Sequence, residues 1–174
     1  FKSGDDLRQD ALTLQIMRIM AHAWEEARVN VKLTTYLAVP TGFERGFIEL
    51  VLHSEPTASI TTRYAGGASG AFAKEPMALY LREHNKSEAQ YGAAVNNFCA
   101  SLAGSCVATY VMGIGDRHND NVLLSKFGSI AHIDFGHFLG NFKFKYGVKR
   151  EKGTFVFTPD MAHVLGGRTS ETYD

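Results

Sequence analysis

GIGDRHNDNVLLSKFGSIAHIDFGH, which occupies residues 113–137, joins two clusters of polar residues through two short apolar runs. The apolar runs, 122–124 and 130–133, are separated by a glycine-containing turn, and this pattern predicts a small β-hairpin. A hairpin returns the chain to its starting point. We therefore expect Asn121, just before the first strand, and Asp134, just after the second, to face one another across a small gap.

These polar groups have the chemistry of a magnesium-dependent phosphoryl-transfer site. The amide oxygen of Asn121 and the carboxylate of Asp134 are hard ligands, and they suit Mg²⁺ because this ion completes its shell with phosphate oxygens and water. Asp116 and His118 are expected at the rim of the gap, where either could deprotonate or orient a substrate hydroxyl. The alternative is an Asp/Asn-rich turn unrelated to the Asp-Phe-Gly tripeptide. His132, in the second apolar run, is expected to be structural.

The sequence on the amino-terminal side predicts a helix followed by two strands. Residues 5–28 have apolar side chains at helical spacing and aspartates near their start, which indicates a helix with a wide buried face. Residues 31–39 and 45–52 are rich in apolar and β-branched side chains, so they predict a second hairpin. Residues 53–56 are expected to form a connector and to mark a domain boundary.

The remaining sequence predicts two helices and two loops. Residues 75–84 predict a short helix, and residues 88–112 predict a long one with apolar groups at four–three spacing. The glycine-rich residues 64–72 lack the GK[ST] ending of a P-loop, so we expect a loop without phosphate contacts. Residues 141–155 predict an irregular loop, and the last residues predict a helix or a frayed end.

The composition excludes several classes of protein. Of the 174 residues 45% are hydrophobic, which is enough for one globular domain and excludes general disorder. The 18 basic residues are balanced by 18 acidic ones, which argues against a generic nucleic-acid binder. Residues 89–115 carry no charge but contain many polar side chains, so a buried helix is favoured over a membrane span. Residues 1–10 show no signal peptide and no initial Met, and we expect a piece of a larger protein.

The two cysteines, Cys99 and Cys106, fall in the long expected helix. Their spacing separates the two Cα atoms by roughly 10 Å at the helical rise per residue. A disulfide needs Cα atoms closer than about 7 Å. We therefore expect two reduced thiols in the core, as is typical of a cytosolic protein.

The motifs GIGDRHNDN and HIDFGH resemble the catalytic and activation segments of the phosphoinositide 3-kinases and their relatives. FKSGDDLRQD, at residues 1–10, resembles the lysine strand of that family and the helix after it. The order Asp-Arg-His replaces the His-Arg-Asp of ordinary protein kinases. The resemblance, from Phe1 to about Gly167, implies a kinase-like, two-lobed α+β fold that is truncated here. Residues 1–52 would be a small-lobe remnant and residues 53–174 a large-lobe part, inactive as an isolated fragment.

The resemblance also implies a site for ATP and Mg²⁺. Lys2 would reach the ATP phosphates, and Asp10, together with Asp5, would orient that lysine or the nucleotide. Backbone groups of Glu49 and Val51 would bond the adenine. In the family pattern, Asn121 and Asp134 hold the metal, and Asp116 with His118 serves the attacking hydroxyl. The residues expected around the nucleotide are Lys2, Asp10, Tyr36, Ile48, Glu49, Val51, Leu123 and Ile133.

The loop after the Asp-Phe-Gly motif, NFKFKYGVKREKGTF at residues 141–155, carries five cations and one anion. Such a cluster can bind inositol phosphates and an anionic bilayer, although a solvated basic loop is the alternative. The cation spacing is most similar to class I phosphoinositide 3-kinases, which accept the 4,5-bisphosphate. Phe144 and Gly153-Thr154 depart from their usual sequence. The residues expected at the headgroup are Lys143, Lys145, Lys149, Arg150 and Lys152.

The resemblance as a whole implies a lipid kinase that transfers the γ-phosphate of ATP to the 3-hydroxyl of a phosphoinositide, with phosphatidylinositol 4,5-bisphosphate as the expected acceptor. The implied partners are a phosphoinositide at a membrane surface and a regulatory subunit or adjoining domains, and not nucleic acid. The implied location is the cytoplasm, with peripheral recruitment to membranes. The alternatives are a phosphatidylinositol 4-kinase or a related protein serine/threonine kinase, a non-enzymatic pseudokinase, and an unrelated metal-binding domain.

Overall fold

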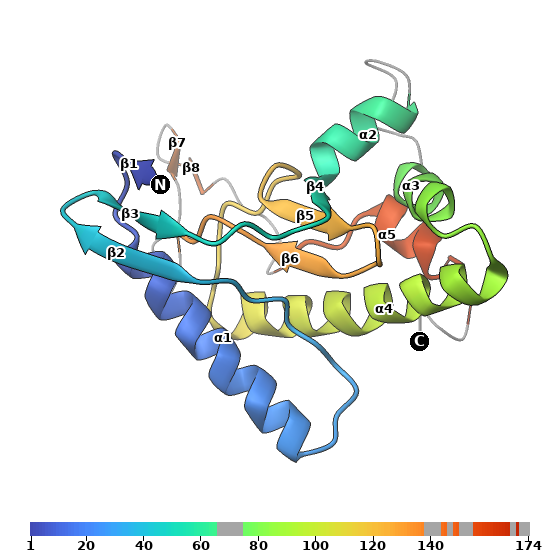
Figure 1. The fold of residues 1–174 in the computed structure, drawn as a ribbon, viewed down its shortest axis with the longest axis horizontal. Coiled ribbons are helices and arrows are strands. Elements are labelled where there is room, and N and C mark those ends of the chain that lie inside the picture. The colour runs from blue at the N-terminus through green and yellow to red at the C-terminus, as the bar shows by residue number, and fades with distance from the viewer. Residues whose placement is uncertain (66–74, 138–143, 146–147, 150–154, 168–169, 171–174) are drawn as a thin grey trace.

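The computed structural model describes residues 1–65, 75–137, 144–145, 148–149, 155–167 and 170. The expected mixture of helices and strands is confirmed, and every strand pair is antiparallel (Figure 1). The helices are α1 (Arg8–Glu26), α2 (Thr57–Ala65), α3 (Pro76–His84), α4 (Glu88–Val111) and α5 (Pro159–Val164). The strands are β1 (Lys2–Ser3), β2 (Ala38–Gly42), β3 (Arg45–Ile48), β4 (Ser54–Pro56), β5 (Val122–Ser125), β6 (Ile130–His132), β7 (Phe144–Lys145) and β8 (Val148–Lys149).

The first sheet has the strand order β1–β3–β2 and packs against α1 through β2. Lys2 lies opposite Gly46 in the central strand, and Ala38 lies opposite Ile48. A side chain at Gly46 is excluded, because a Cβ atom there would lie 2.3 Å from the carbonyl oxygen of Val39. This pairing places Lys2 in the same sheet as β3, and therefore close to the chain that follows β3.

The strand expected over residues 31–39 is wrong for most of its length, since β2 begins only at Ala38. The chain before it crosses α4 instead: the backbone N–H of Lys32 donates to the carbonyl of Ala100 at 3.0 Å. Gly104 permits this crossing, because a Cβ atom there would lie 2.2 Å from the Lys32 carbonyl oxygen. Contact with a helix has therefore replaced strand pairing in a segment with strand-like composition.

The second sheet has the order β4–β5–β6, and its β5–β6 pair confirms the expected hairpin. Gly128 forms the turn with a φ of +93°, a conformation that favours glycine. A Cβ atom at Gly128 would lie 1.9 Å from the carbonyl oxygen of Ala94, so the turn rests directly on α4. Figure 1 shows α4 running along this sheet beneath β6.

The connector expected at residues 53–56 is also wrong, because Ser54–Pro56 forms the strand β4. Ser54 lies opposite Ser125, and Pro56 lies opposite Leu123. Proline is compatible with this position because β4 is an edge strand. The chain thus joins the second sheet immediately after leaving the first. The first sheet and α1 consist of residues before 49, whereas the first strand of the second sheet begins at residue 54.

The long helix α4 matches its expected range and begins with a capping box. The Ser87 side chain accepts from the Gln90 N–H, and the Gln90 side chain accepts from the Ser87 N–H. Cys99 and Cys106 are not joined in a disulfide, as expected, and each is partly buried. Among the described residues, no helix combines the length and apolar character that a membrane crossing requires.

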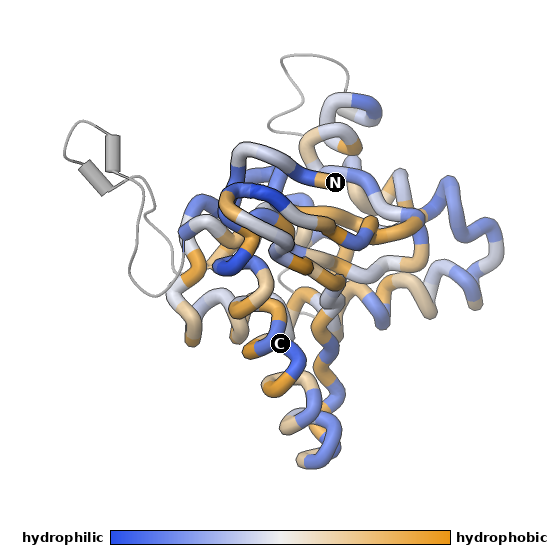
Figure 2. Tube along the Cα trace, turned by 60° about the vertical axis from the view of Figure 1, so that its left-hand side comes forward, coloured by the Kyte–Doolittle hydropathy of each residue, from blue (hydrophilic) through white to orange (hydrophobic). Residues whose placement is uncertain are grey.

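Two hydrophobic clusters form the core, and Figure 2 shows hydrophobic segments gathered at the central strands. The larger lies between α4, the β5–β6 hairpin and helices α2, α3 and α5. The smaller lies between α1, Tyr36 and Phe135. The buried face of α1 is narrower than expected, because Leu12 and Ile19 are 47% and 69% exposed.

Candidate active site

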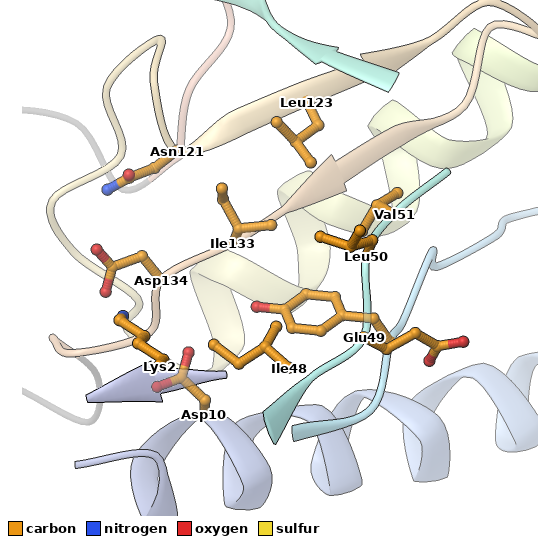
Figure 3. Close-up of a pocket in the computed structure, with 11 residues that line it drawn as sticks. Lys2, Asp10, Ile48, Glu49, Leu50, Val51, Asn121, Leu123, Ile133 and Asp134 are labelled. Carbon is orange, nitrogen blue, oxygen red and sulfur yellow. The ribbon is translucent and has the colours of Figure 1, made fainter. Parts of the chain in front are cut away.

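A cavity of about 260 Å³ brings together residues of both sheets. Figure 3 shows β1, α1 and the chain after β3 on one side, and β5 with the end of β6 on the other. Every residue expected around the nucleotide or the metal lines this cavity, and Leu50 lines it as well. The lining residues are Lys2, Asp10, Tyr36, Ile48, Glu49, Leu50, Val51, Asn121, Leu123, Ile133 and Asp134.

The middle of the cavity is apolar. Ile48 comes from β3, whereas Leu123 and Ile133 come from the β5–β6 hairpin (Figure 3). Tyr36 is buried, and its ring is nearly parallel to that of Phe135, with centroids 6.4 Å apart. Burial raises the pKa of Tyr36, and the charge of Asp10 raises it further, so the phenol stays neutral. Apolar walls of this kind suit a flat aromatic ligand.

The backbone after β3 is paired in an unusual way that leaves a carbonyl and an N–H group available to a ligand. Glu49 donates its N–H to the carbonyl of Leu37 at 2.8 Å. The N–H of Leu37 does not return this bond to the Glu49 carbonyl but donates to the Glu49 carboxylate at 2.8 Å. Nearby, the carbonyl of Val51 accepts from the Ser54 hydroxyl at 2.6 Å. Among the described residues, the Glu49 carbonyl and the Val51 N–H have no backbone partner, so both can serve a ligand.

Lys2 and Asp5 form an ion pair at the polar end of the cavity. Partial burial lowers the pKa of Lys2, but the hydrogen bond and charge of Asp5, together with the charges of Asp134 and Asp10, raise it overall. The lysine is therefore positively charged, as phosphate binding requires. Asp5 is its ion-pair partner.

Asp10 lines the cavity from α1, as expected, and is buried. Its side chain is 3% exposed, and its Oδ1 accepts from the backbone N–H of Phe135 at 3.2 Å. Burial raises the pKa of Asp10, whereas the Phe135 N–H and the charge of Lys2 oppose this shift. Asp10 thus ties α1 to the Asp-Phe-Gly segment while it lines the cavity.

The side chains of Asn121 and Asp134 lie near one another at the polar end of the cavity (Figure 3). The amide nitrogen of Asn121 donates to the Asp116 carbonyl at 2.9 Å, which leaves its Oδ1 available for a cation. No group of three or more His, Cys, Asp or Glu residues in the described parts of the chain could hold a metal alone. Two oxygen ligands fit Mg²⁺, because phosphates and water complete its shell.

Asp116 and His118 lie in the loop that leads to Asn121, outside the cavity lining. The Nδ1 of His118 accepts from the backbone N–H of Asp120 at 3.3 Å. The same Nδ1 lies 3.4 Å from a carboxylate oxygen of Asp120. Asp116 has a φ of +54°, an uncommon conformation for a residue with a side chain.

The sequence did not indicate Arg117, which joins this loop to the Asp-Phe-Gly segment. Its guanidinium donates to the carbonyls of Gly115 at 2.8 Å, Ile133 at 2.6 Å and Asp134. His132 is buried, and its pKa falls to about 3 because of burial and the charge of Arg117. A neutral, buried His132 agrees with the expected structural role. The position of Arg117 between Asp116 and His118 was the only signal for it in the sequence.

The expected headgroup residues lie partly outside the described residues. Lys143, Arg150 and Lys152 are among those that are not described. Lys145 ends β7 and Lys149 ends β8, and these strands pair with Lys149 opposite Phe144. The expectation of an irregular loop is therefore wrong at these two short strands.

A comparison with protein families identifies the fold family. The model of the family "Phosphatidylinositol 3- and 4-kinase" matches residues 1–174. Phosphatidylinositol 3-kinase 1 of Dictyostelium discoideum is 54% identical over 170 residues, which is 98% of this chain and 11% of the relative. Phosphatidylinositol 3-kinase 3 of the same organism is 52% identical over 172 residues, 99% of this chain and 10% of the relative.

A human relative, phosphatidylinositol 4-phosphate 3-kinase C2 domain-containing subunit beta, is 46% identical over 167 residues, 96% of this chain and 10% of the relative. The chain therefore spans about a tenth of the length of the curated relatives that it matches. The family match over the whole chain agrees with the motifs at residues 1–10 and 113–137. The chain belongs to the phosphatidylinositol 3- and 4-kinase family.

Proposed function

We propose that this chain is the catalytic part of a lipid kinase that transfers the γ-phosphate of ATP to the 3-hydroxyl of a phosphoinositide. The observation that carries the proposal is the cavity, which joins apolar walls to a polar end with Lys2, Asn121 and Asp134. The names of the relatives support the same reaction. Adenine would lie between Ile48 and Ile133, with bonds to the backbone after β3.

The polar end of the cavity has the groups that phosphoryl transfer needs. Asn121 and Asp134 would hold Mg²⁺, which neutralises phosphate charge when it is bound. Lys2 would contact the phosphates as a point cation. The substrate hydroxyl forms the new P–O bond while the bond from the γ-phosphorus to ADP breaks, and the hydroxyl proton passes to a base. Asp116 and His118 are the two candidates for this base, and the one that does not take the proton would orient the hydroxyl.

The arrangement of the elements supports a two-lobed organisation. Residues 1–52 contain β1, α1, β2 and β3, which form one sheet and its helix. Residues 53–174 contain the second sheet and the remaining helices. The cavity draws its residues from both parts. We infer that these parts correspond to a small and a large lobe, with the nucleotide bound between them.

We further propose that the acceptor is phosphatidylinositol 4,5-bisphosphate, presented by a membrane to a protein that is recruited from the cytoplasm. The basic residues of 141–155 support this choice, because each cation near an anionic surface contributes about 1 kcal/mol. The name of the human relative specifies a 4-phosphate acceptor, which makes phosphatidylinositol 4-phosphate the second candidate. Adjoining domains or a regulatory subunit would complete the enzyme.

The reaction is tested by incubating the full-length protein with Mg²⁺-ATP and each phosphoinositide, and by mapping the position of the new phosphate. We expect 3-phosphorylated lipid, and an Asp134→Asn variant should lose at least about 100-fold in rate, because several kcal/mol of charge stabilisation depend on the metal. Asp6→Asn, at a partly exposed position outside the cavity lining, is the matched control and should keep full activity. A product phosphorylated at the 4-position, or on peptides alone, would replace the proposal with one of its alternatives.

The headgroup is tested by replacing Lys149 and Arg150 with alanine in the full-length protein. We expect kcat/KM for the 4,5-bisphosphate to fall roughly tenfold or more, with a smaller change for unphosphorylated phosphatidylinositol. A double replacement of the exposed Arg28 and Lys86 keeps the same net charge change and should behave as wild type. Unchanged turnover of the bisphosphate would remove the basic loop from headgroup recognition and leave the kinase assignment in place.

A further inference from the structure

Arg117 makes contacts that the reaction chemistry alone does not require. Its side chain leaves the loop before β5 and reaches the chain that follows β6. Nε donates to the carbonyl of Gly115 at 2.8 Å and Nη1 to the carbonyl of Ile133 at 2.6 Å, while Nη2 donates to the carbonyl of Asp134. One side chain thus connects three backbone positions on the two segments that carry Asn121 and Asp134.

The backbone of Asp134 needs such support. Its φ of +61° is uncommon for a residue with a side chain, and such a conformation persists only where the surrounding structure fixes it. The carbonyl of Asp134 bonds to Arg117, and the next backbone N–H, that of Phe135, bonds to Asp10. Arg117 also bonds to the carbonyl of Ile133, so it holds the peptide groups on both sides of the Asp134 Cα atom and thereby the torsion angles that set the direction of the Asp134 carboxylate.

The ring of Phe135 completes this arrangement. It lies 5.5 Å from the guanidinium carbon of Arg117 and packs beside the Tyr36 ring. Burial lowers the pKa of Arg117, the charges of Asp134 and Asp116 oppose this shift, and the guanidinium stays charged.

We propose that Arg117 is a positioning residue that keeps the Asp134 carboxylate aimed at the metal and phosphate end of the cavity. The proposal rests on the proposed function, because it assigns a purpose to the direction of Asp134. Arginine is required for geometric reasons. Its planar group presents five donors in fixed directions, whereas the ammonium of lysine is a point charge that cannot serve three separated carbonyls in this way.

The test compares Arg117→Lys with wild type in the full-length protein, using three measurements. Hydrogen–deuterium exchange reports the backbone of residues 130–137, with α4 as an internal reference. Binding of adenosine without metal reports the apolar part of the cavity. The Mg²⁺ concentration that gives half-maximal turnover reports the metal end. Arg82→Lys, at an exposed arginine that contacts Tyr91 and Glu88, is the matched control.

For Arg117→Lys we expect faster exchange in residues 130–137 with unchanged exchange in α4. Adenosine affinity should stay within about twofold, and the half-maximal Mg²⁺ concentration should rise about tenfold, an effect of about 1.4 kcal/mol. Arg82→Lys should match wild type in all three measurements. Wild-type Mg²⁺ dependence in Arg117→Lys would overturn the proposal. So would a combined loss of adenosine binding and of α4 protection, because Arg117 would then support the fold as a whole. A wild-type protein that binds neither adenosine nor Mg²⁺ would instead refute the proposed function.

Discussion

The two ends of the β5–β6 hairpin are built in opposite ways. At the turn, Gly128 rests on α4, and the side chains of Leu124 and Ile130 are fully buried in the larger hydrophobic cluster. At the open end, Asn121 and the chain beyond β6 are held by hydrogen bonds to carbonyls, a carboxylate and a guanidinium. Apolar packing therefore sets the place of the hairpin, whereas polar contacts set the direction of its terminal side chains.

This difference predicts where stability and activity can be separated. Complete burial of one large apolar side chain contributes about 1.5–3 kcal/mol, whereas a typical hydrogen bond contributes a net 0.5–1.5 kcal/mol. Changes at the turn end should consequently destabilise the domain. Changes at the open end should alter ligand binding and turnover while the domain stays folded.

The largest expected effect on stability comes from Phe98→Ala in α4. Phe98 has no exposed surface and packs in the cluster under the hairpin, so its truncation should lower the free energy of unfolding by about 3–5 kcal/mol. Amide-exchange protection of α4 and β5 in the full-length protein measures this loss. Phe98→Leu, which keeps most of the volume, should lose much less. Equal protection in wild type and Phe98→Ala would show that the turn end does not carry the stability.

A second prediction concerns Asp160, a carboxylate buried at the start of α5 beside the same cluster. It accepts from the Met77 N–H at 3.2 Å, and burial raises its pKa to about 6 from the ordinary value of 3.8. The unfolded chain therefore ionises first as the pH rises, and the stabilising contribution present below pH 3.8 is lost by about pH 6. Stability due to this group falls as the pH rises through that window.

Asp160→Asn should remove this pH dependence, because an amide does not ionise but can still accept from Met77. Relative to wild type, the variant should gain about 2–3 kcal/mol between pH 4 and pH 7. Amide-exchange protection of α3 and α5, corrected for the intrinsic pH dependence of exchange, measures the difference. Parallel pH profiles in the two proteins would contradict the prediction.

The smallest expected effect is at Glu49, whose carboxylate takes the Leu37 N–H and so keeps the Glu49 carbonyl out of strand pairing. In Glu49→Ala the Leu37 N–H can bond to that carbonyl and compete with adenine. We expect adenosine to bind about threefold to tenfold more weakly, which is the range of one hydrogen bond. Glu49→Gln, which keeps an acceptor oxygen, is the control. Equal adenosine affinity in wild type and Glu49→Ala would show that the carboxylate has no influence on the site.

The same contrast explains how far the sequence could be interpreted. Apolar spacing and a glycine turn predicted the hairpin and α4, because these elements depend on local pattern and burial. The prediction of a strand was wrong for residues 31–37, because this segment contacts α4 although its composition is typical of a strand. The prediction of a connector was wrong for residues 54–56, because an edge strand of only three residues has no clear sequence pattern. Local pattern gives no information on which distant segment will be the partner.

The candidate site was predicted mainly through motifs, and the residues missed by the sequence have a common reason. Asn121 and Asp134 have side chains whose chemistry points to a metal, so spacing alone suggested that they meet. Arg117 bonds to backbone carbonyls, which every residue possesses, so no sequence pattern marks its partners. Leu50 lines the cavity only because of the course that the chain takes after β3.

The central claim is that Asn121 and Asp134 together hold a divalent ion at the polar end of the nucleotide cavity. Mn²⁺ binding to the full-length protein, measured by electron paramagnetic resonance with a non-hydrolysable ATP analogue, tests it most directly. We predict that Asp134→Asn and Asn121→Ala each weaken Mn²⁺ binding at least about tenfold, while adenosine still binds. Mn²⁺ affinity equal to wild type in both variants would contradict the claim.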